Sequence, residues 1–170
     1  MEYLHHVCQA LVVIDMQACF LEQHAALVPP LEGAVEIINH VAAALRKAGH
    51  AVIWLRDHET IPVDDPRGRI LDSLDVDPAD PQIEKVASNA FVEPALPALL
   101  ERLKVEFVWF CGYRAEQCVL ATARGASDRG LPFALVRGAI LAPDIEAVSF
   151  VERLFPLASH EVVTAHCKRS

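Results

Sequence analysis

Apolar runs alternate with stretches of helical periodicity along most of the chain. The apolar runs are short and rich in β-branched or aromatic residues, as is typical of buried strands. We expect strands over 10–14, 51–55, 83–87, 105–112, 132–136 and 161–165. Elsewhere apolar side chains recur every three or four positions, which predicts amphipathic helices. We expect helices over 31–48, 96–103, 115–129 and 145–154.

The alternation of charge-poor strands with helices predicts an α/β protein. Such strands are buried on both faces, which favours a mostly parallel, Rossmann-like sheet of five or six strands in a three-layer α/β/α arrangement. No repeat or linker divides the sequence, so we expect a single domain over 1–170. Residues 59–82 are rich in Asp and Pro and predict a long loop of the kind that is often functional.

Composition excludes several classes of partner. Lys and Arg total 15 against 23 Asp and Glu, a net charge of −8, which disfavours nucleic acids and anionic membrane surfaces. No apolar run is long enough to span a membrane, and the first residues lack the basic region and cleavage site of a signal peptide. We therefore expect a cytoplasmic protein. Its five cysteines are odd in number and lack CxxC spacing, which predicts reduced thiols.

Three residues with reactive side chains follow predicted strands. In parallel sheets ligands bind at the carboxyl ends of the strands, where Asp15, Asp57 and Cys118 should gather. Cys118 should lie in the first turn of a helix, whose free N–H groups would lower the pKa of its thiol and cradle an oxyanion. The alternatives are a small buried apolar residue for Cys118 and a helix cap or turn residue for Asp15.

Three segments of the sequence stand out together: VIDMQACF (13–20), KVASNAF (85–91) and GYRAEQCVLATARGA (112–126). In this order and spacing they resemble the isochorismatase-like cysteine hydrolases, a superfamily that includes nicotinamidase and N-carbamoylsarcosine amidase. The intervening elements agree as well, so the resemblance extends over nearly the full chain.

The resemblance implies roles for particular residues. Asp15, Lys85 and Cys118 would form the catalytic triad. A non-proline cis peptide would fall at Tyr113–Arg114, and the backbone N–H groups of Arg114 and Cys118 would form the oxyanion hole.

The chain departs from the family pattern beside the nucleophile. Ala115 stands where the family usually has Thr, and Arg114 where it has a small or apolar residue. We expect Arg114 beside the substrate pocket, where a guanidinium suits a carboxylate or ureido oxygen; the alternative is that it points to solvent. Phe20, Asp57 and Tyr113 are the other residues that we expect to line the pocket.

A metal site is not expected. Nicotinamidases share Asp-x-His after the second strand, whereas Asp57 and His58 are adjacent here, so their side chains leave an extended strand in opposite directions. This disfavours nicotinamide as the substrate. We expect His58 to be exposed or at the pocket rim.

The candidate residues and the resemblance together predict hydrolysis of a C–N bond in a small amide, ureide or carbamoyl compound through a thioester, with no cofactor. One alternative is an isochorismatase-type vinyl-ether hydrolase with Asp15 as general acid. Another is a thiol redox sensor in which oxidised Cys118 joins Cys111 or Cys19. The resemblance also implies a homo-oligomer, dimer or tetramer, and a small-molecule substrate as the other partner.

Overall fold

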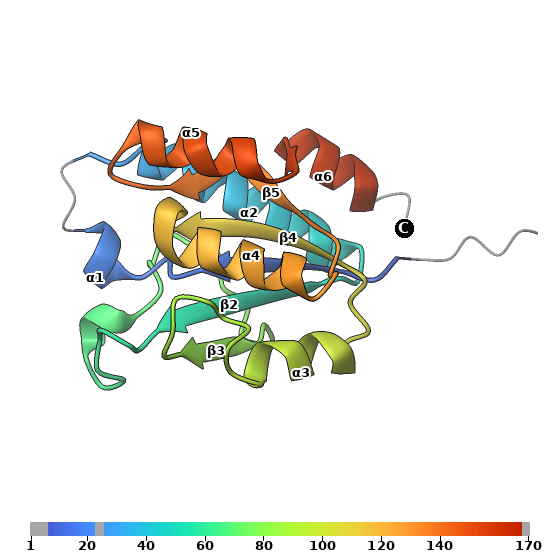
Figure 1. The fold of residues 1–170 in the computed structure, drawn as a ribbon, viewed down its shortest axis with the longest axis horizontal. Coiled ribbons are helices and arrows are strands. Elements are labelled where there is room, and N and C mark those ends of the chain that lie inside the picture. Colours follow the sequence, from blue (N-terminus) through green and yellow to red (C-terminus); the bar gives the residue numbers. More distant parts are fainter. Residues whose placement is uncertain (1–6, 23–25, 168–170) are drawn as a thin grey trace, which may run out of the picture.

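A computed structural model describes residues 7–22 and 26–167, and these residues contain one six-stranded sheet (Figure 1). Every hydrogen-bonded pair of strands in it is parallel. The strands are β1 (Gln9–Ile14), β2 (Ala51–Asp57), β3 (Gln82–Lys85), β4 (Phe107–Tyr113), β5 (Phe133–Leu141) and β6 (Leu157–Ala158). Their order, β3-β2-β1-β4-β5-β6, is that of a Rossmann-type sheet, so the predicted fold class is confirmed.

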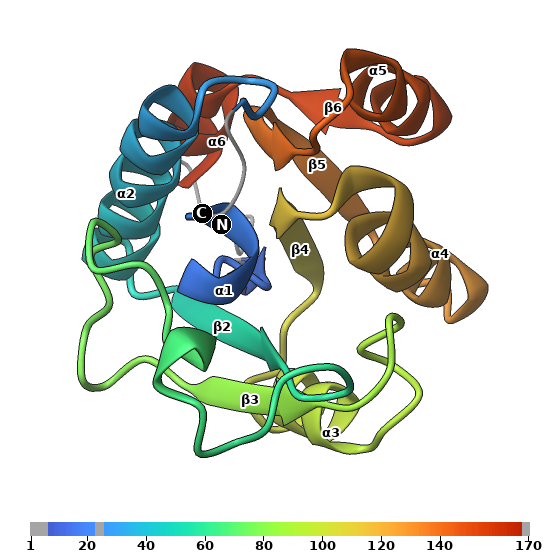
Figure 2. The same ribbon diagram turned by 90° about the vertical axis from the view of Figure 1, so that its left-hand side faces the viewer.

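Helices cover both faces of the sheet, so the fold has three layers, with the sheet in the middle (Figure 2). The helices α2 and α6 lie on one face, and α3, α4 and α5 on the other. The α-helices are α1 (Ala18–Leu21), α2 (Leu31–Lys47), α3 (Ala95–Arg102), α4 (Leu120–Asp128), α5 (Ile145–Leu154) and α6 (His160–Cys167). A 3₁₀ turn, η1 (Pro66–Gly68), lies in the long loop, and a π-helical turn, η2 (Ala115–Val119), leads into α4. Residues 1–6, on which the expectation about a signal peptide partly depends, lie outside the described residues.

The strand β1 forms the centre of the core because it lies between β2 and β4. Each of its residues is at most 1% exposed, which is why residues 10–14 form a continuous apolar run. Trp54 and Trp109 are buried in the neighbouring strands, as expected of core residues. Burying one large apolar side chain contributes about 1.5–3 kcal/mol to stability.

The strand expected at 161–165 is wrong, because these residues belong to helix α6. Val163 and Cys167 are buried and stand four positions apart, which is the spacing of one helix face. The Val163 N–H donates to the carbonyl of Ser159, a residue type common at helix starts. Packing against α2 therefore overrides the strand preference of this β-branched stretch.

Helix α5 is present as predicted, but only part of its apolar series faces the core. Val148 and Val151 are buried, whereas Ile145 and Leu154 are 54% and 51% exposed. A helix turns about 100° per residue, so an apolar residue at every third position drifts around the helix. The first and last members of the series consequently fall on the flanks of the outer face.

Candidate active site

The reactive residues gather at the carboxyl edge of the sheet, where the strand order reverses between β1 and β4. Asp15 directly follows β1, while Asp57 and Lys85 are the last residues of β2 and β3. Cys118 lies in η2, five residues after the end of β4. This edge is where open α/β sheets bind ligands.

The backbone turns sharply at Asp15. Its φ of +50° lies in the left-handed region, which Asp tolerates better than most residues. Its N–H donates to the carbonyl of Leu55 at 3.1 Å, and the N–H of Gln17 donates to the Asp15 carbonyl at 2.8 Å. Residues held in such conformations cluster at functional sites, so the turn supports a role for Asp15 beyond that of a cap.

Gly112 allows β4 to approach this turn. Its φ is +120°, and a Cβ at this position would lie 2.1 Å from the Ile14 carbonyl oxygen. Only glycine fits this contact, which brings the segment leading to Cys118 beside Asp15. The peptide Tyr113–Arg114 is cis, which confirms the expectation from the resemblance.

The ammonium group of Lys85 joins the other three reactive side chains. Its Nζ lies 2.8 Å from Asp15 Oδ2, 3.3 Å from Asp57 Oδ1 and 3.4 Å from Cys118 Sγ. It also donates to the Ala87 carbonyl at 3.2 Å. The side chains of Lys85, Asp15 and Asp57 are 3%, 2% and 6% exposed, so the charges interact with little screening by water.

Gln17 holds the ends of β1 and β2 together, a role that the sequence analysis missed. Its Oε1 accepts from the Asp57 N–H at 2.7 Å, and its Nε2 donates to the carbonyls of Asp57 and Gly68 at 3.3 and 2.9 Å. The side chain is completely buried. An amide in the quoted VIDMQ segment, just after a buried strand, was the available signal.

Thr122 performs a similar task for the loop that follows Lys85. Its Oγ1 accepts from the Ala90 N–H at 3.2 Å and donates to the Ser88 carbonyl at 3.3 Å. Because α4 directly follows the turn that carries Cys118, these two hydrogen bonds fix the position of that turn relative to the loop after Lys85.

Burial dominates the proton affinities of the site. It raises the pKa of Asp15 to about 6, although Lys85 opposes the shift. Burial lowers the pKa of Lys85, but the nearby charges of Asp15, Cys118 and Asp57 outweigh it and the pKa is raised overall. Burial and then the Asp15 charge raise the pKa of Cys118 to about 12, with Lys85 acting in the opposite direction. The expected lowering of this thiol pKa is therefore wrong, because burial and the Asp15 charge outweigh the opposing effect of Lys85.

A cavity of about 180 Å³ opens on Asp15 and Cys118. All four residues expected to line the pocket lie in its wall, namely Phe20, Asp57, Tyr113 and Arg114. The rings of Phe20 and Tyr113 are stacked, with centroids 6.0 Å apart. The wall also contains residues that the sequence analysis did not name individually, among them Glu59, Thr60 and Gln117.

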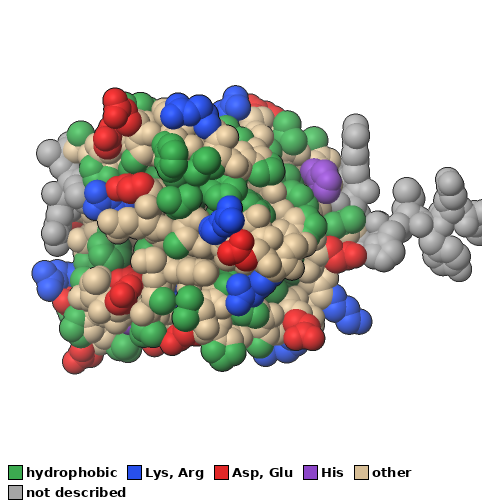
Figure 3. Space-filling view, viewed as in Figure 1, with side chains coloured by type: hydrophobic (Ala, Val, Ile, Leu, Met, Phe, Trp, Pro, Cys, Tyr) green, Lys and Arg blue, Asp and Glu red, His purple; other side chains and the backbone are tan. Residues whose placement is uncertain are grey.

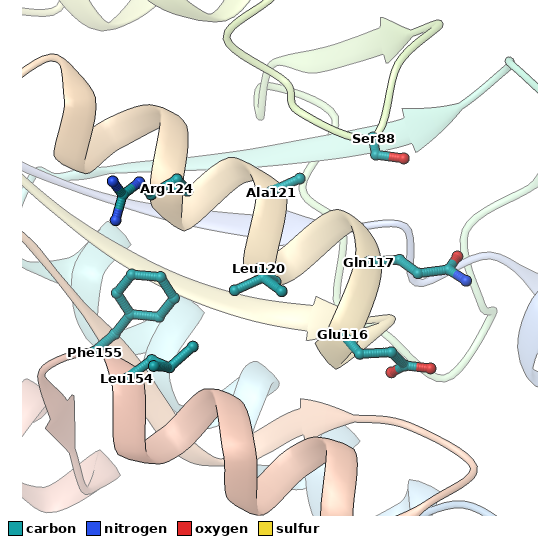
Figure 4. Close-up of a pocket in the computed structure, with 8 residues that line it drawn as sticks. All are labelled: Ser88, Glu116, Gln117, Leu120, Ala121, Arg124, Leu154 and Phe155. Carbon is teal, nitrogen blue, oxygen red and sulfur yellow. The ribbon is translucent and has the colours of Figure 1, made fainter.

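A larger hollow of about 540 Å³ lies beside this cavity (Figure 4). Ser88 and Gln117 line both spaces. The larger hollow is mainly apolar and extends between α4 and α5, where Leu120 points toward Leu154 and Phe155. The two spaces therefore adjoin at two polar side chains.

The expectation that His58 is exposed or at the pocket rim is wrong, because its side chain is 3% exposed and it is not among the residues that line the cavity at Asp15 and Cys118. Its Nδ1 lies 2.9 Å from the Ile61 carbonyl, which ties the ring to the long loop. Within residues 7–22 and 26–167, no three His, Cys, Asp or Glu side chains converge as metal ligands would. The same residues include no helix with the length and apolar character of a membrane span.

The family model of the isochorismatase domain matches residues 9–165. The chain belongs to the isochorismatase family. Two streptothricin hydrolases of Streptomyces noursei are each 30% identical to this isochorismatase-family protein over 154 residues, 88% of its length. The chain covers only 61% and 55% of these two relatives.

Solved structures share the fold. A cysteine hydrolase from Pseudomonas syringae superposes with a TM-score of 0.82 at 19% identity, over 94% of this chain and 92% of that chain. The N-carbamoylsarcosine amidase of Thermoplasma acidophilum superposes with a TM-score of 0.76 at 23% identity, over 90% and 95% of the two chains. At these identities the likeness establishes the architecture alone.

Proposed function

We propose that this isochorismatase-family protein is a cysteine hydrolase that cleaves a C–N bond of a small amide, ureide or carbamoyl compound. The observation that carries the proposal is the position of Lys85 Nζ, 2.8 Å from Asp15 Oδ2 and 3.4 Å from Cys118 Sγ. An acid, an amine and a thiol thus meet at one pocket, as an activated nucleophile requires. Two solved relatives, named a cysteine hydrolase and an amidase, support the same chemistry.

Acylation begins when Asp15 takes the Cys118 proton while the sulfur attacks the substrate carbonyl carbon. A free thiolate is not needed in the resting protein, because the negative charge passes at once to the carbonyl oxygen. The N–H groups of Arg114 and Cys118 are the proposed donors to that oxygen, and one such donor is worth about 3–4 kcal/mol. Asp15 then protonates the leaving nitrogen, the C–N bond breaks, and a thioester remains.

Deacylation reverses these roles with water as the nucleophile. Asp15 deprotonates the water as it attacks the thioester carbon, and the proton returns to Cys118 as the acid product leaves. Lys85 stays charged at neutral pH because its pKa is raised, and it offsets the negative charge that moves between Asp15 and the sulfur. Each step uses only groups of the chain and water.

Trapping the acyl group tests the proposed thioester. We expect turnover of a small amide in the presence of hydroxylamine to yield the hydroxamate as well as the acid, because the amine intercepts the acyl-enzyme. Acid-quenched protein should carry the acyl mass on the peptide that contains Cys118, as peptide mapping would reveal. Amide cleavage that gives neither hydroxamate nor this adduct would rule out the thioester route.

We also propose that two copies of the chain pack through the outer face of α5. This face presents Glu146 and Arg153, neither of which has an ion-pair partner among the residues that the structure describes. Exposed Phe150 lies between them, and Ile145 and Leu154 flank them. Figure 3 shows hydrophobic side chains gathered over α5 and the space between it and α4. An antiparallel second α5 would bring Glu146 opposite Arg153 twice and cover the apolar residues.

Charge reversal tests this interface. Glu146→Arg is expected to weaken dimerisation about tenfold, because it places like charges opposite each other. Adding Arg153→Glu to the same chain should restore the dimer, since the antiparallel pairs are re-formed with opposite polarity. Light scattering after size-exclusion chromatography measures both. A wild-type monomer, or a double variant no more dimeric than Glu146→Arg alone, contradicts the interface.

A further inference from the structure

The charges around the catalytic pocket do not balance. Asp15 and Asp57 share a single cation, because Lys85 lies within 3.3 Å of both carboxylates. Asp57 is further satisfied by Thr60, whose hydroxyl donates to Oδ2 at 2.8 Å. The buried group therefore retains one formal negative charge when both acids are ionised.

Arg114 does not supply the missing positive charge. Its guanidinium forms a close ion pair with Glu116, two residues along the chain, through Nε and Oε1. The pair is formally neutral, and both side chains remain about one-third exposed. The expected binding of a substrate carboxylate by Arg114 would have to compete with this carboxylate, which is already in place.

Glu59 adds a second uncompensated charge at the pocket wall. Its side chain is exposed and lines the pocket together with Asp57 and Thr60. No cation pairs with it among residues 7–22 and 26–167. The pocket wall with its paired groups thus has a formal charge of −2: four carboxylates (Asp15, Asp57, Glu59 and Glu116) against Lys85 and Arg114.

An aromatic pair in the same wall independently favours a cation. The rings of Phe20 and Tyr113 stack with their planes 24° apart and both line the cavity. The face of an aromatic ring carries partial negative charge and attracts ammonium and guanidinium groups. An anionic substrate group would instead lie beside these two rings and the carboxylates of Asp57 and Glu59.

We propose that the substrate is an amide or ureide that carries a positively charged nitrogen, and that Glu59 determines this specificity. The cationic group lies between the Glu59 carboxylate and the faces of Phe20 and Tyr113, while the reacting carbonyl lies at Cys118. This inference rests on the proposed function, because it assigns the substrate class of the same pocket. Long-range attraction from the buried acids adds to the contact with Glu59.

Three amides of the same length test the preference. 4-Aminobutanamide is cationic, pentanamide is its neutral counterpart, and glutaramate is anionic. We expect kcat/KM for the cation to exceed that for pentanamide about tenfold at low salt, with glutaramate slowest. Glu59→Gln should reduce the cation-to-neutral ratio severalfold. Asp64→Asn removes the same charge from an exposed residue of the same loop outside the pocket wall, and should leave the ratio unchanged.

Labelling of Cys118 gives a readout that needs no hydrolysis. The reagents are the methanethiosulfonates that bear an aminoethyl or a sulfonatoethyl group, which form mixed disulfides of opposite charge. Faster labelling of Cys118 by the cationic reagent, with a smaller rate ratio in Glu59→Gln than in Asp64→Asn, supports the inference. Equal labelling, including none by either reagent, or faster labelling by the anion overturns it.

The two experiments separate failure of this inference from failure of the proposed function. Hydrolysis that depends on Cys118 but shows no preference for the cationic amide would reject the proposed substrate class and support the proposed cysteine hydrolase mechanism. Faster labelling by the cationic reagent without hydrolysis of any amide would support a cationic ligand and reject the proposed amide hydrolysis. A preference that survives Glu59→Gln unchanged removes Glu59 as the determinant.

Discussion

Cys118→Ala is expected to lower kcat for amide hydrolysis by about 10³-fold or more, because no other group at the pocket can form the thioester. Cys118→Ser should lose nearly as much, since Asp15 would have to deprotonate a far weaker acid. The measurement is ammonia release from a panel of small amides and ureides. The alanine variant should keep its fold, because it removes one sulfur from a residue that is only partly buried.

A matched control is Cys111→Ala on the adjoining strand β4. Cys111 is 1% exposed, and burial raises the pKa of its thiol far above the ordinary range. Its removal should leave hydrolysis within about twofold, since a buried thiol of this kind is inert. Wild-type turnover of an amide by Cys118→Ala would contradict the mechanism. Retained activity of that variant on isochorismate would instead select vinyl-ether hydrolysis with Asp15 as general acid.

Asp15→Asn is expected to lower kcat/KM by about 10²–10⁴-fold, the usual contribution of a general base. In the wild type the base works only when ionised, and burial raises the Asp15 pKa to about 6. We therefore expect kcat/KM to fall about tenfold per pH unit below that value and to level off above it. The pH–rate profile of the residual activity in Asp15→Asn should lack this acidic limb.

Two observations distinguish this result from unfolding or from a different base. Because the folded pKa of Asp15 is raised, its stabilising contribution is fully present below about pH 4, the pKa in an unfolded chain, and is lost as pH rises through about 6. Asp15→Asn should consequently have a Tm at pH 7 no lower than the wild type. Asp57→Asn changes the other carboxylate that contacts Lys85, and this variant should retain the fall in kcat/KM at acidic pH. An acidic limb that persists in Asp15→Asn and disappears in Asp57→Asn would transfer the role to Asp57.

Much of the architecture could be read from the sequence because parallel strands are buried on both faces. The run at β1 is apolar for this reason, and five of the six predicted strands match strands of the sheet. The failure at 161–165 has the opposite cause. Its β-branched residues favour a strand locally, but Val163 and Cys167 are buried on one side of a helix that packs on α2.

Two members of the candidate triad could be placed at one edge of the sheet from the sequence, because Asp15 and Cys118 follow predicted strands and parallel strands end at the same edge. The set of Asp15, Lys85 and Cys118 came from the resemblance to the isochorismatase-like cysteine hydrolases, and the structure brings their side chains into contact. Their catalytic roles stay a prediction. Gln17 was missed because its function is to join two strand ends, which only folding brings together.

The sequence by itself determined the fold class, the strand edge that carries the site and the identity of the three reactive side chains. Only the tertiary structure decided how those side chains behave. The pKa of Cys118 is raised because burial removes water from the sulfur, and this desolvation cannot be read from position along a chain. Likewise, the pairing of Arg114 with Glu116 leaves two negative charges uncompensated at the pocket, one shared by Asp15 and Asp57 and one on Glu59, because ion pairs depend on distances in space.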